Sequence, residues 1–413
     1  MTAWSPVWAV SVNGAGDVTN LTLADLTITS GRTDIYSQPL AGYARFTIKN
    51  LTQSAISFDV NDSVVIKVKN SAGVFVPIFG GDVTDIDVVV QTGRPYITEN
   101  VTITALGALA KLPKTLTEGV LTKDFDGNQI YTILSQLLFG SWNEVPAAIQ
   151  WATYEPTITW ANAENTGLGE IDRPGDYELA ARASSTTDIY SLVSGLATSG
   201  LGYIYEDSVG RIGYADSTHR GQYLAANGYY SVDGGHAYAP GITTSKRLGD
   251  VRNKVTITYK NGQQVSAESL DSISKYGYQA QNIQTSIENL ADATSQADFY
   301  LALRSYPRSQ FKAITFPLTN SAIPDAGRDG ALGVFMGQPL DIENLPTNIA
   351  LGRFQGFVEG WTWQSRQGAL DLTVFVSPIA YSLQAFRWNN VPVTETWNTI
   401  IPTLDWNNAT IVA

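Results

Sequence analysis

The stretch Val64-Val65-Ile66-Lys67-Val68-Lys69-Asn70-Ser71-Ala72-Gly73-Val74-Phe75-Val76-Pro77-Ile78-Phe79 predicts a β-hairpin with its turn at Asn70–Gly73. β-Branched and aromatic residues favour strands, and Asn and Gly favour tight turns. Similar short alternating runs lie at 8–12, 46–50 and 97–105. Such strands, joined by Gly-containing turns, are typical of barrels and small sandwiches. We therefore predict an antiparallel β domain over residues 1–110.

A different pattern begins at residue 111. Asp126-Gly127-Asn128-Gln129 is typical of a helix N-terminus, with Asp as the cap and Gln completing a capping box. Apolar residues then follow on one helical face up to Gly140: Ile130, Ile133, Leu134, Leu137 and Leu138. We expect a second helix over 188–198 and a hairpin over 203–214. The sequence thus predicts a small α+β insert over residues 111–240.

The strand pattern returns between residues 241 and 380. Strands are expected at 255–259, 311–316, 340–342, 354–363 and 370–376. One helical face is formed by Ala293, Ala297, Tyr300, Leu301 and Arg304. The predicted fold class is therefore mainly β, with two β regions separated by the α+β insert.

The last segment, residues 381–413, carries three Trp-Asn pairs at a constant spacing of nine residues, at Trp388, Trp397 and Trp406. Neither a helix nor a strand would place all three indoles on one face at this spacing. Pro392 and Pro402 break regular pairing between them, so we predict an extended arm that offers one Trp per segment. The arm could dock on a partner, pack on its own domain or stack on sugars. Aliphatic neighbours such as Val391 and Ile400 favour burial, and hence docking.

Composition narrows the functional class. The 413 residues include only 15% charged residues, have a net charge of −12 and lack cysteine. The sequence has no basic cluster, so we predict no specific nucleic-acid binding. The absence of cysteine excludes a disulfide framework and a thiolate metal site. We expect no signal peptide and no membrane span, because neither the start of the chain nor any longer stretch has the necessary apolar run.

The candidate motifs for chemistry are weak, so we predict no catalytic, cofactor-binding or metal-binding residues. His219 and His236 stand in no catalytic or metal-binding motif and are interpreted as surface or turn residues. The run from Asp124 to Asn128 resembles the opening of a calcium loop but lacks its later ligands. Glu359, near Trp361 and Trp363, has no evident partner carboxylate for glycoside hydrolysis. We interpret these two tryptophans as partner-docking residues, packed on a neighbouring barrel or on the arm.

Several short sequence motifs occur in an order that resembles the minor tail proteins of long-tailed phages infecting actinobacteria. They are Thr29-Ser30-Gly31-Arg32-Thr33-Asp34-Ile35, Asp250-Val251-Arg252-Asn253-Lys254-Val255, Ser272-Ile273-Ser274-Lys275-Tyr276-Gly277, Asn344-Leu345-Pro346 and Val358-Glu359-Gly360-Trp361-Thr362-Trp363. More broadly, the chain is similar to the hub proteins of phage baseplates and tail tips.

This resemblance implies two tube-like β-barrel domains in one chain, at 1–110 and 241–380. It also implies a homotrimer in the virion whose ring joins the tail tube to distal tail proteins and lines the DNA exit channel. The implied partners are the distal tail ring, the tape measure and further minor tail proteins. Two alternatives stay open: a tail protein that binds a receptor or cell-wall carbohydrate, and a hexameric distal tail ring protein.

Overall fold

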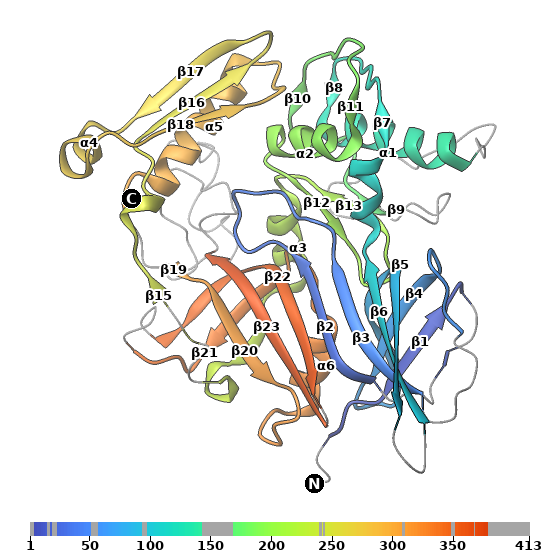
Figure 1. Cartoon of the computed structure of the whole chain (residues 1–413). Coiled ribbons are helices and arrows are strands. Elements are labelled where there is room, and N and C mark those ends of the chain that lie inside the picture. Colours follow the sequence, from blue (N-terminus) through green and yellow to red (C-terminus); the bar gives the residue numbers. More distant parts are fainter. Residues whose placement is uncertain are drawn as a thin grey trace.

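The computed structural model describes residues 4–14, 17–18, 23–50, 57–92, 97–142, 168–238, 242, 244–307, 310–347, 352–366 and 368–378. The C-terminal segment 381–413, with Trp388, Trp397 and Trp406, lies outside these residues. Strands dominate over helices, so the predicted mainly β fold class is confirmed (Figure 1).

One eleven-stranded sheet forms the base of the molecule (Figure 1). Its main path follows the order β1-β4-β5-β6-β3-β2-β22-β21-β14, and β23 pairs with both β22 and β20. The strands are β1 (Trp8–Val12), β2 (Leu23–Gly31), β3 (Tyr43–Asn50), β4 (Ser63–Lys69), β5 (Phe75–Thr92), β6 (Ile97–Leu106), β14 (Tyr230–Asp233), β20 (Ala313–Pro317), β21 (Pro339–Glu343), β22 (Phe354–Arg366) and β23 (Ala369–Pro378).

The predicted hairpin of residues 64–79 is confirmed as β4 and β5. Lys69 pairs with Phe75, and the turn is closed by hydrogen bonds from Asn70 N to Val74 O (2.8 Å) and from Gly73 N to Asn70 O (3.1 Å). Gly73 adopts a φ of 82°, a left-handed conformation that glycine tolerates without strain. Local sequence therefore determines this part of the sheet.

The two β regions meet where β2 pairs antiparallel with β22, from Thr27 opposite Gln364 to Gly31 opposite Gly360. The N-terminal strands, blue in Figure 1, thereby continue into the C-terminal strands, orange and red. Two separate barrels are not confirmed: among the described residues no strand pairing closes either half on itself. The physical reason is that the backbone groups on the outer edge of β2 pair with β22, and not with another strand of the N-terminal half.

The insert lies above the sheet in Figure 1. It contains a three-stranded sheet in the order β12-β13-β9, two short strand pairs and helices α1 to α3. Its elements are η1 (Ala108–Lys114), β7 (Leu116–Thr117), β8 (Asp124–Phe125), α1 (Asp126–Trp142), β9 (Leu168–Ile171), β10 (Glu178–Leu179), β11 (Thr187–Asp188), α2 (Ile189–Ser199), β12 (Tyr203–Glu206), β13 (Ile212–Ala215) and α3 (His219–Asn227), with η2 (Gly234–His236) further along the chain.

Both predicted helices and the hairpin of the insert are present, but the predicted capping box is wrong. The side chain of Gln129 donates to the carbonyl oxygens of Thr122 (2.8 Å) and Ala180 (3.1 Å), and Asp126 N donates to Tyr177 O. In α2, by contrast, the side chain of Asp188 accepts from Ser191 N at 2.8 Å, a standard N-cap.

A third group of elements packs beside the insert. The strands β16 (Lys254–Tyr259), β17 (Gln263–Glu268) and β18 (Ala280–Gln284) form a sheet in the order β17-β16-β18, and α5 (Leu290–Arg304) contacts β16 and β17. The remaining elements are β15 (Thr244–Ser245), η4 (Leu248–Asp250), α4 (Leu270–Tyr276), β19 (Gln310–Phe311) and α6 (Asp325–Leu332).

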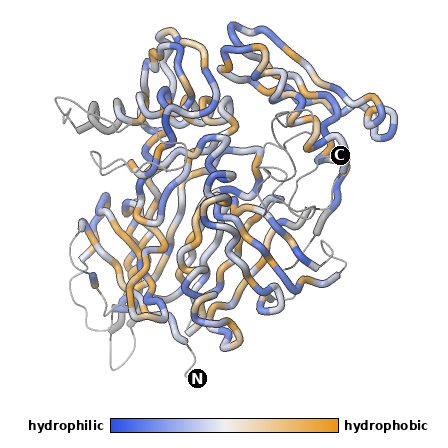
Figure 2. Tube along the Cα trace, turned by 180° about the vertical axis from the view of Figure 1, so that it is seen from behind, coloured by the Kyte–Doolittle hydropathy of each residue, from blue (hydrophilic) through white to orange (hydrophobic). Residues whose placement is uncertain are grey.

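Buried apolar residues form two clusters. The first belongs mainly to the large sheet, where hydrophobic and hydrophilic residues alternate along the strands (Figure 2). The second joins the insert to the third group, since Val255, Ile257 and Ala297 share it with Ile130 and Leu196. The domain boundaries proposed from the sequence stay a prediction, because a hydrophobic cluster does not by itself mark a domain.

Candidate functional site

The most buried charge in the region where the sheet meets the insert is Glu359, which is 1% exposed. It lies in β22, where the pairing with β23 shifts register between Val358 and Gly360. A β-bulge of this kind re-aims a side chain relative to its neighbours on the strand. The local sequence Val358-Glu359-Gly360 therefore places a carboxylate inside the protein.

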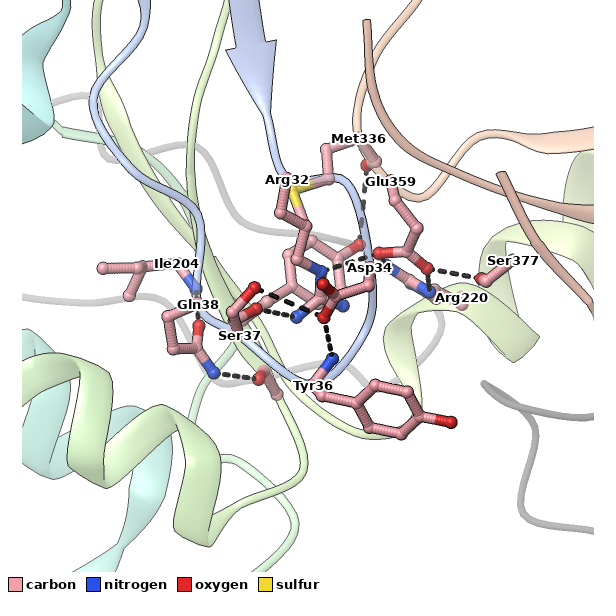
Figure 3. Close-up of polar contacts among 12 residues, drawn as sticks. Arg32, Asp34, Tyr36, Ser37, Gln38, Ile204, Arg220, Met336, Glu359 and Ser377 are labelled. Atoms are coloured by element: carbon pink, nitrogen blue, oxygen red, sulfur yellow. Dashed lines mark hydrogen bonds and ion pairs between the residues drawn. The ribbon is translucent and has the colours of Figure 1, made fainter. Parts of the chain in front are cut away.

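Four hydrogen bonds hold this carboxylate (Figure 3). Arg220 Nη1 lies 2.6 Å from Oε1 and Nη2 lies 2.9 Å from Oε2, while Arg32 Nε lies 2.7 Å from Oε2. Ser377 Oγ donates to Oε1 at 2.5 Å. Arg32 directly follows β2, and the other three side chains come from α3, β22 and β23, so the cluster ties the insert to both halves of the sheet.

Electrostatics keep the carboxyl group of Glu359 ionised. Burial alone would raise its pKa, but the positive charges of Arg220 and Arg32 outweigh this effect and lower the pKa to about 2. Burial would likewise lower the pKa of Arg220, and the charge of Glu359 raises it instead. Each oxygen of Glu359 already accepts two donors, so the group has no free site for proton transfer. We interpret the cluster as structural, not catalytic.

The ring of Tyr203 completes the cluster. The guanidinium carbons of Arg220 and Arg32 lie 4.5 Å and 5.5 Å from its centroid, within the range of cation–π contacts. The backbone also approaches closely here, since Arg32 N donates to Glu359 O at 2.9 Å. A Cβ on Gly31 would lie 2.4 Å from that carbonyl oxygen, so the approach requires glycine.

This cluster was not predicted from the sequence, although Glu359 itself was considered as a residue for glycoside hydrolysis. The signal was an acidic residue inside a strand of aromatic and aliphatic residues, since a buried carboxylate needs a cationic partner. Arg32 is 327 residues away and could not be identified as that partner from spacing.

Two cavities lie on the insert side of Arg32, and both are lined by Arg32, Gln38 and Thr198. The smaller, of about 80 Å³, is also bordered by Tyr203, Arg220 and Tyr300. The larger, of about 560 Å³, is an open groove between the loop 31–40 and α2, bordered by Leu40, Tyr190 and Gly195.

A second candidate feature is one face of the large sheet. Across seven strands, from β5 to β20, one row reads Asp85, Thr104, Arg45, Thr27, Gln364, Asp371 and Pro317. The adjacent row reads Asp82, Leu106, Tyr43, Thr29, Thr362, Thr373 and Thr315, so it is polar apart from Leu106. The Thr315 and Thr373 hydroxyls lie 2.8 Å apart. This polar face runs without interruption across the junction of β2 and β22.

The opposite face is apolar and buried. The row beside those above reads Val83, Ala105, Ala44, Ile28, Trp363, Leu372 and Phe316. Trp363 and Trp361, the two predicted docking residues inside the described chain, are 0% and 4% exposed and belong to this core. Their indole N–H groups have no hydrogen-bond acceptor among the described residues. A docking role for them stays a prediction, and the structure places both against their own sheet.

His219 is not a surface residue, contrary to the sequence interpretation. It is 6% exposed, and its Nδ1 lies 2.8 Å from Oδ2 of Asp172. Burial opposes the charged form, but the hydrogen bond to Asp172 raises the pKa of the imidazole overall. His236 is half-buried at the end of η2. The described residues contain no group of His, Asp and Glu side chains able to hold a metal ion.

None of the helices in the described residues is long and apolar enough to cross a membrane. No protein-family model matches the sequence, and no curated protein matches it.

Solved structures do resemble the fold. The tail protein from Neisseria meningitidis MC58 matches with a TM-score of 0.56 and 12% identity, covering 92% of this chain and 100% of that one. The 43 kDa tail protein of prophage MuSo2 from Shewanella oneidensis has a TM-score of 0.49 and 11% identity, with 91% and 99% of the two chains covered. Prophage tail protein gp18 from Listeria monocytogenes EGD-e has a TM-score of 0.45 and 11% identity, with 89% and 94% covered. The chain therefore shares its fold with the Neisseria tail protein over nearly the whole length of both.

Proposed function

We propose that this chain is a structural protein of a phage tail, in which copies of it form a ring whose wall is the polar face of the large sheet. The observation that carries the proposal is the continuity of that face: seven strands from both ends of the chain present one polar surface, backed by one apolar core. The shared fold with the Neisseria tail protein supports the same role.

The chemistry of the polar face suits a channel wall. Six of the fourteen residues in these two rows are Thr, and the charges of Asp82, Asp85 and Asp371 are offset in part by Arg45. Tight binding of DNA depends on many cationic contacts to phosphates. A surface with few charges of both signs, on a chain of net charge −12, would let DNA pass without holding it.

The outer half of β5 supports an assembly of several copies. Among the described residues, β4 pairs with β5 only between Phe75 and Asp82, so the second edge of β5 beyond that point has no strand partner. Val88, Val89 and Val90 there are 45%, 56% and 53% exposed. Open strand edges with exposed apolar residues are characteristic of surfaces that pair with another chain. We propose that a neighbouring copy covers this edge, in a homotrimer at the tail tip that joins the tail tube to distal tail proteins.

Native mass spectrometry and electron microscopy of the purified full chain would test the proposal. We expect a ring-shaped trimer, and the double variant Val88→Lys/Val90→Lys should shift it to monomer by placing charges on the edge. Val74→Lys is the matched control, because Val74 is 59% exposed but lies in the β4–β5 turn. A hexamer would indicate a distal ring protein instead, and a monomer at every concentration would contradict the proposal.

A further inference from the structure

The open groove beside α2 has the features of a receptor for a flat apolar side chain. Its volume of about 560 Å³ falls within the roughly 300–1,000 Å³ of small-molecule pockets. Leu40, on its rim, is 69% exposed and adds apolar surface to the groove. Gly195, an exposed residue of α2, has no atom within 4 Å of the position of a Cβ, so the helix leaves open space here.

The polar groups that line the groove could hydrogen-bond an indole N–H and the amide of a neighbouring residue. Arg32 contributes to one wall, where contacts of its guanidinium group with Glu359, the carbonyl oxygen of Ser37 and the ring of Tyr203 hold it in place. Gln284, at the end of β18, and Tyr190, which donates to Pro39 O at 2.8 Å, border the groove as well. An aromatic ring held between apolar and polar walls is the usual form of a docking anchor.

The end of the described chain lies close to this groove. Ser377, next to the last residue of β23, donates to Glu359, and Glu359 binds Arg32, which lines the groove. Figure 3 shows Ser377 and Gln38 on opposite sides of Arg32. The chain then continues for 35 residues after Pro378, and its first Trp-Asn pair begins ten residues further on, at Trp388. Ten extended residues span up to about 33 Å, so the reach is sufficient.

We infer that the groove between the loop 31–40 and α2 is the docking site of Trp388, with Asn389 at its polar rim. This inference rests on the sequence prediction that residues 381–413 form a docking arm. The occupant is the arm of the same chain, because a short tether gives its indole an effective concentration in the millimolar range. Trp397 and Trp406 remain available for a neighbouring subunit.

Disulfide trapping tests the assignment directly, because the chain has no cysteine of its own. The double variant Gly195→Cys/Asn390→Cys should form an intramolecular disulfide at least about tenfold faster than Gly249→Cys/Asn390→Cys. Gly249 is the matched control, since it is also an exposed glycine with no atom within 4 Å of a Cβ. Adding Trp388→Ala should remove the advantage of the first pair, whereas adding Trp397→Ala should leave it unchanged.

Equal rates for the two pairs would overturn the inference, and so would a rate that Trp388→Ala does not affect. A disulfide that forms only between two single-cysteine chains would assign the groove to the arm of a second copy and overturn the same-chain docking. The measurement needs only purified protein and no phage. If the arm is trapped but a variant with Trp388, Trp397 and Trp406 all replaced by Ala still assembles tails, the arm has no role in assembly and this docking site stays in place.

Discussion

Arg220 donates hydrogen bonds to Glu359 from both terminal nitrogens of its guanidinium group, at 2.6 Å to Oε1 and 2.9 Å to Oε2. The arginine belongs to α3 of the insert and the glutamate to β22 of the large sheet. A contact between elements so far apart in sequence fixes how the insert sits on the sheet. Only the planar fork of arginine can make both bonds at once, so lysine is not an equivalent residue here.

Removing this arginine should destabilise the fold strongly. Arg220→Ala leaves Glu359 buried with Arg32 as its one remaining cationic partner, and breaking a buried ion pair typically costs about 3–5 kcal/mol. We expect a loss of this size in the free energy of unfolding, measured by urea titration, and a smaller loss for Arg220→Lys. Lys254→Ala, which removes a solvent-exposed ion pair with Glu268, should change little. Equal effects of the two alanine variants would show that the Glu359 cluster is not a stabilising contact.

Gly31 should be irreplaceable at the β2–β22 junction. It has a φ of 79°, and a Cβ there would lie 2.4 Å from Glu359 O and 2.6 Å from the Cα of Gly360. Gly73 offers a matched control, because its φ is 82° but the only atom near a Cβ is Lys69 Cε at 3.7 Å. Gly73→Ala should cost about 1–2 kcal/mol, the strain of the left-handed backbone alone. Gly31→Ala should lower the thermal midpoint considerably further. Similar thermal midpoints for the two variants would contradict this prediction, because they would mean that β2 and β22 can move apart at Gly31 without loss of stability.

Local sequence was sufficient to predict the elements whose contacts are themselves local. The turn at Gly73 and the predicted helix start near Asp188 depend on residues no more than four positions away, and both are present. The pairing of β2 with β22 could not be predicted in this way. Nothing in the alternation of residues 23–31 specifies a partner more than 300 positions later, and that pairing turned two expected barrels into one sheet.

The same limit applies to the charges. An Asp at the start of a helix predicts a cap exposed to solvent. Asp126 instead is fully buried, where it accepts hydrogen bonds from the hydroxyl of Tyr214 and from Tyr177 N. Tyr214 is 88 residues away. The burial that sets the pKa of Asp126 is therefore a property of the tertiary structure and could not be predicted from the local sequence.

The buried Asp126 should make stability decrease as the pH rises. Burial raises its pKa from 3.8 to about 8, opposed by the hydrogen bond from Tyr214. Between these values the folded state keeps a proton that the unfolded state has lost, so folding is favoured at low pH and weakened toward pH 8. Asp126→Asn cannot ionise. Relative to the unmodified protein, its free energy of unfolding should therefore increase from pH 4 to pH 8, by at most about 5 kcal/mol. A difference that stays constant over this range would show that Asp126 is ionised in the folded protein.

Mutations in the arm of residues 381–413 should distinguish the proposed structural role from the receptor-binding alternative. If the indoles of Trp388, Trp397 and Trp406 are buried against tail proteins, each contributes up to about 5 kcal/mol of apolar burial, and their joint removal should prevent stable assembly. Virions carrying the triple alanine variant should then lack intact tails in electron micrographs. Complete tails that no longer adsorb to host cells would instead assign the three tryptophans to carbohydrate recognition, since stacking on a sugar is needed only after assembly. Single variants refine the result. Trp388→Ala should impair assembly least, because the inferred docking of Trp388 on its own chain leaves the other two tryptophans for the neighbours.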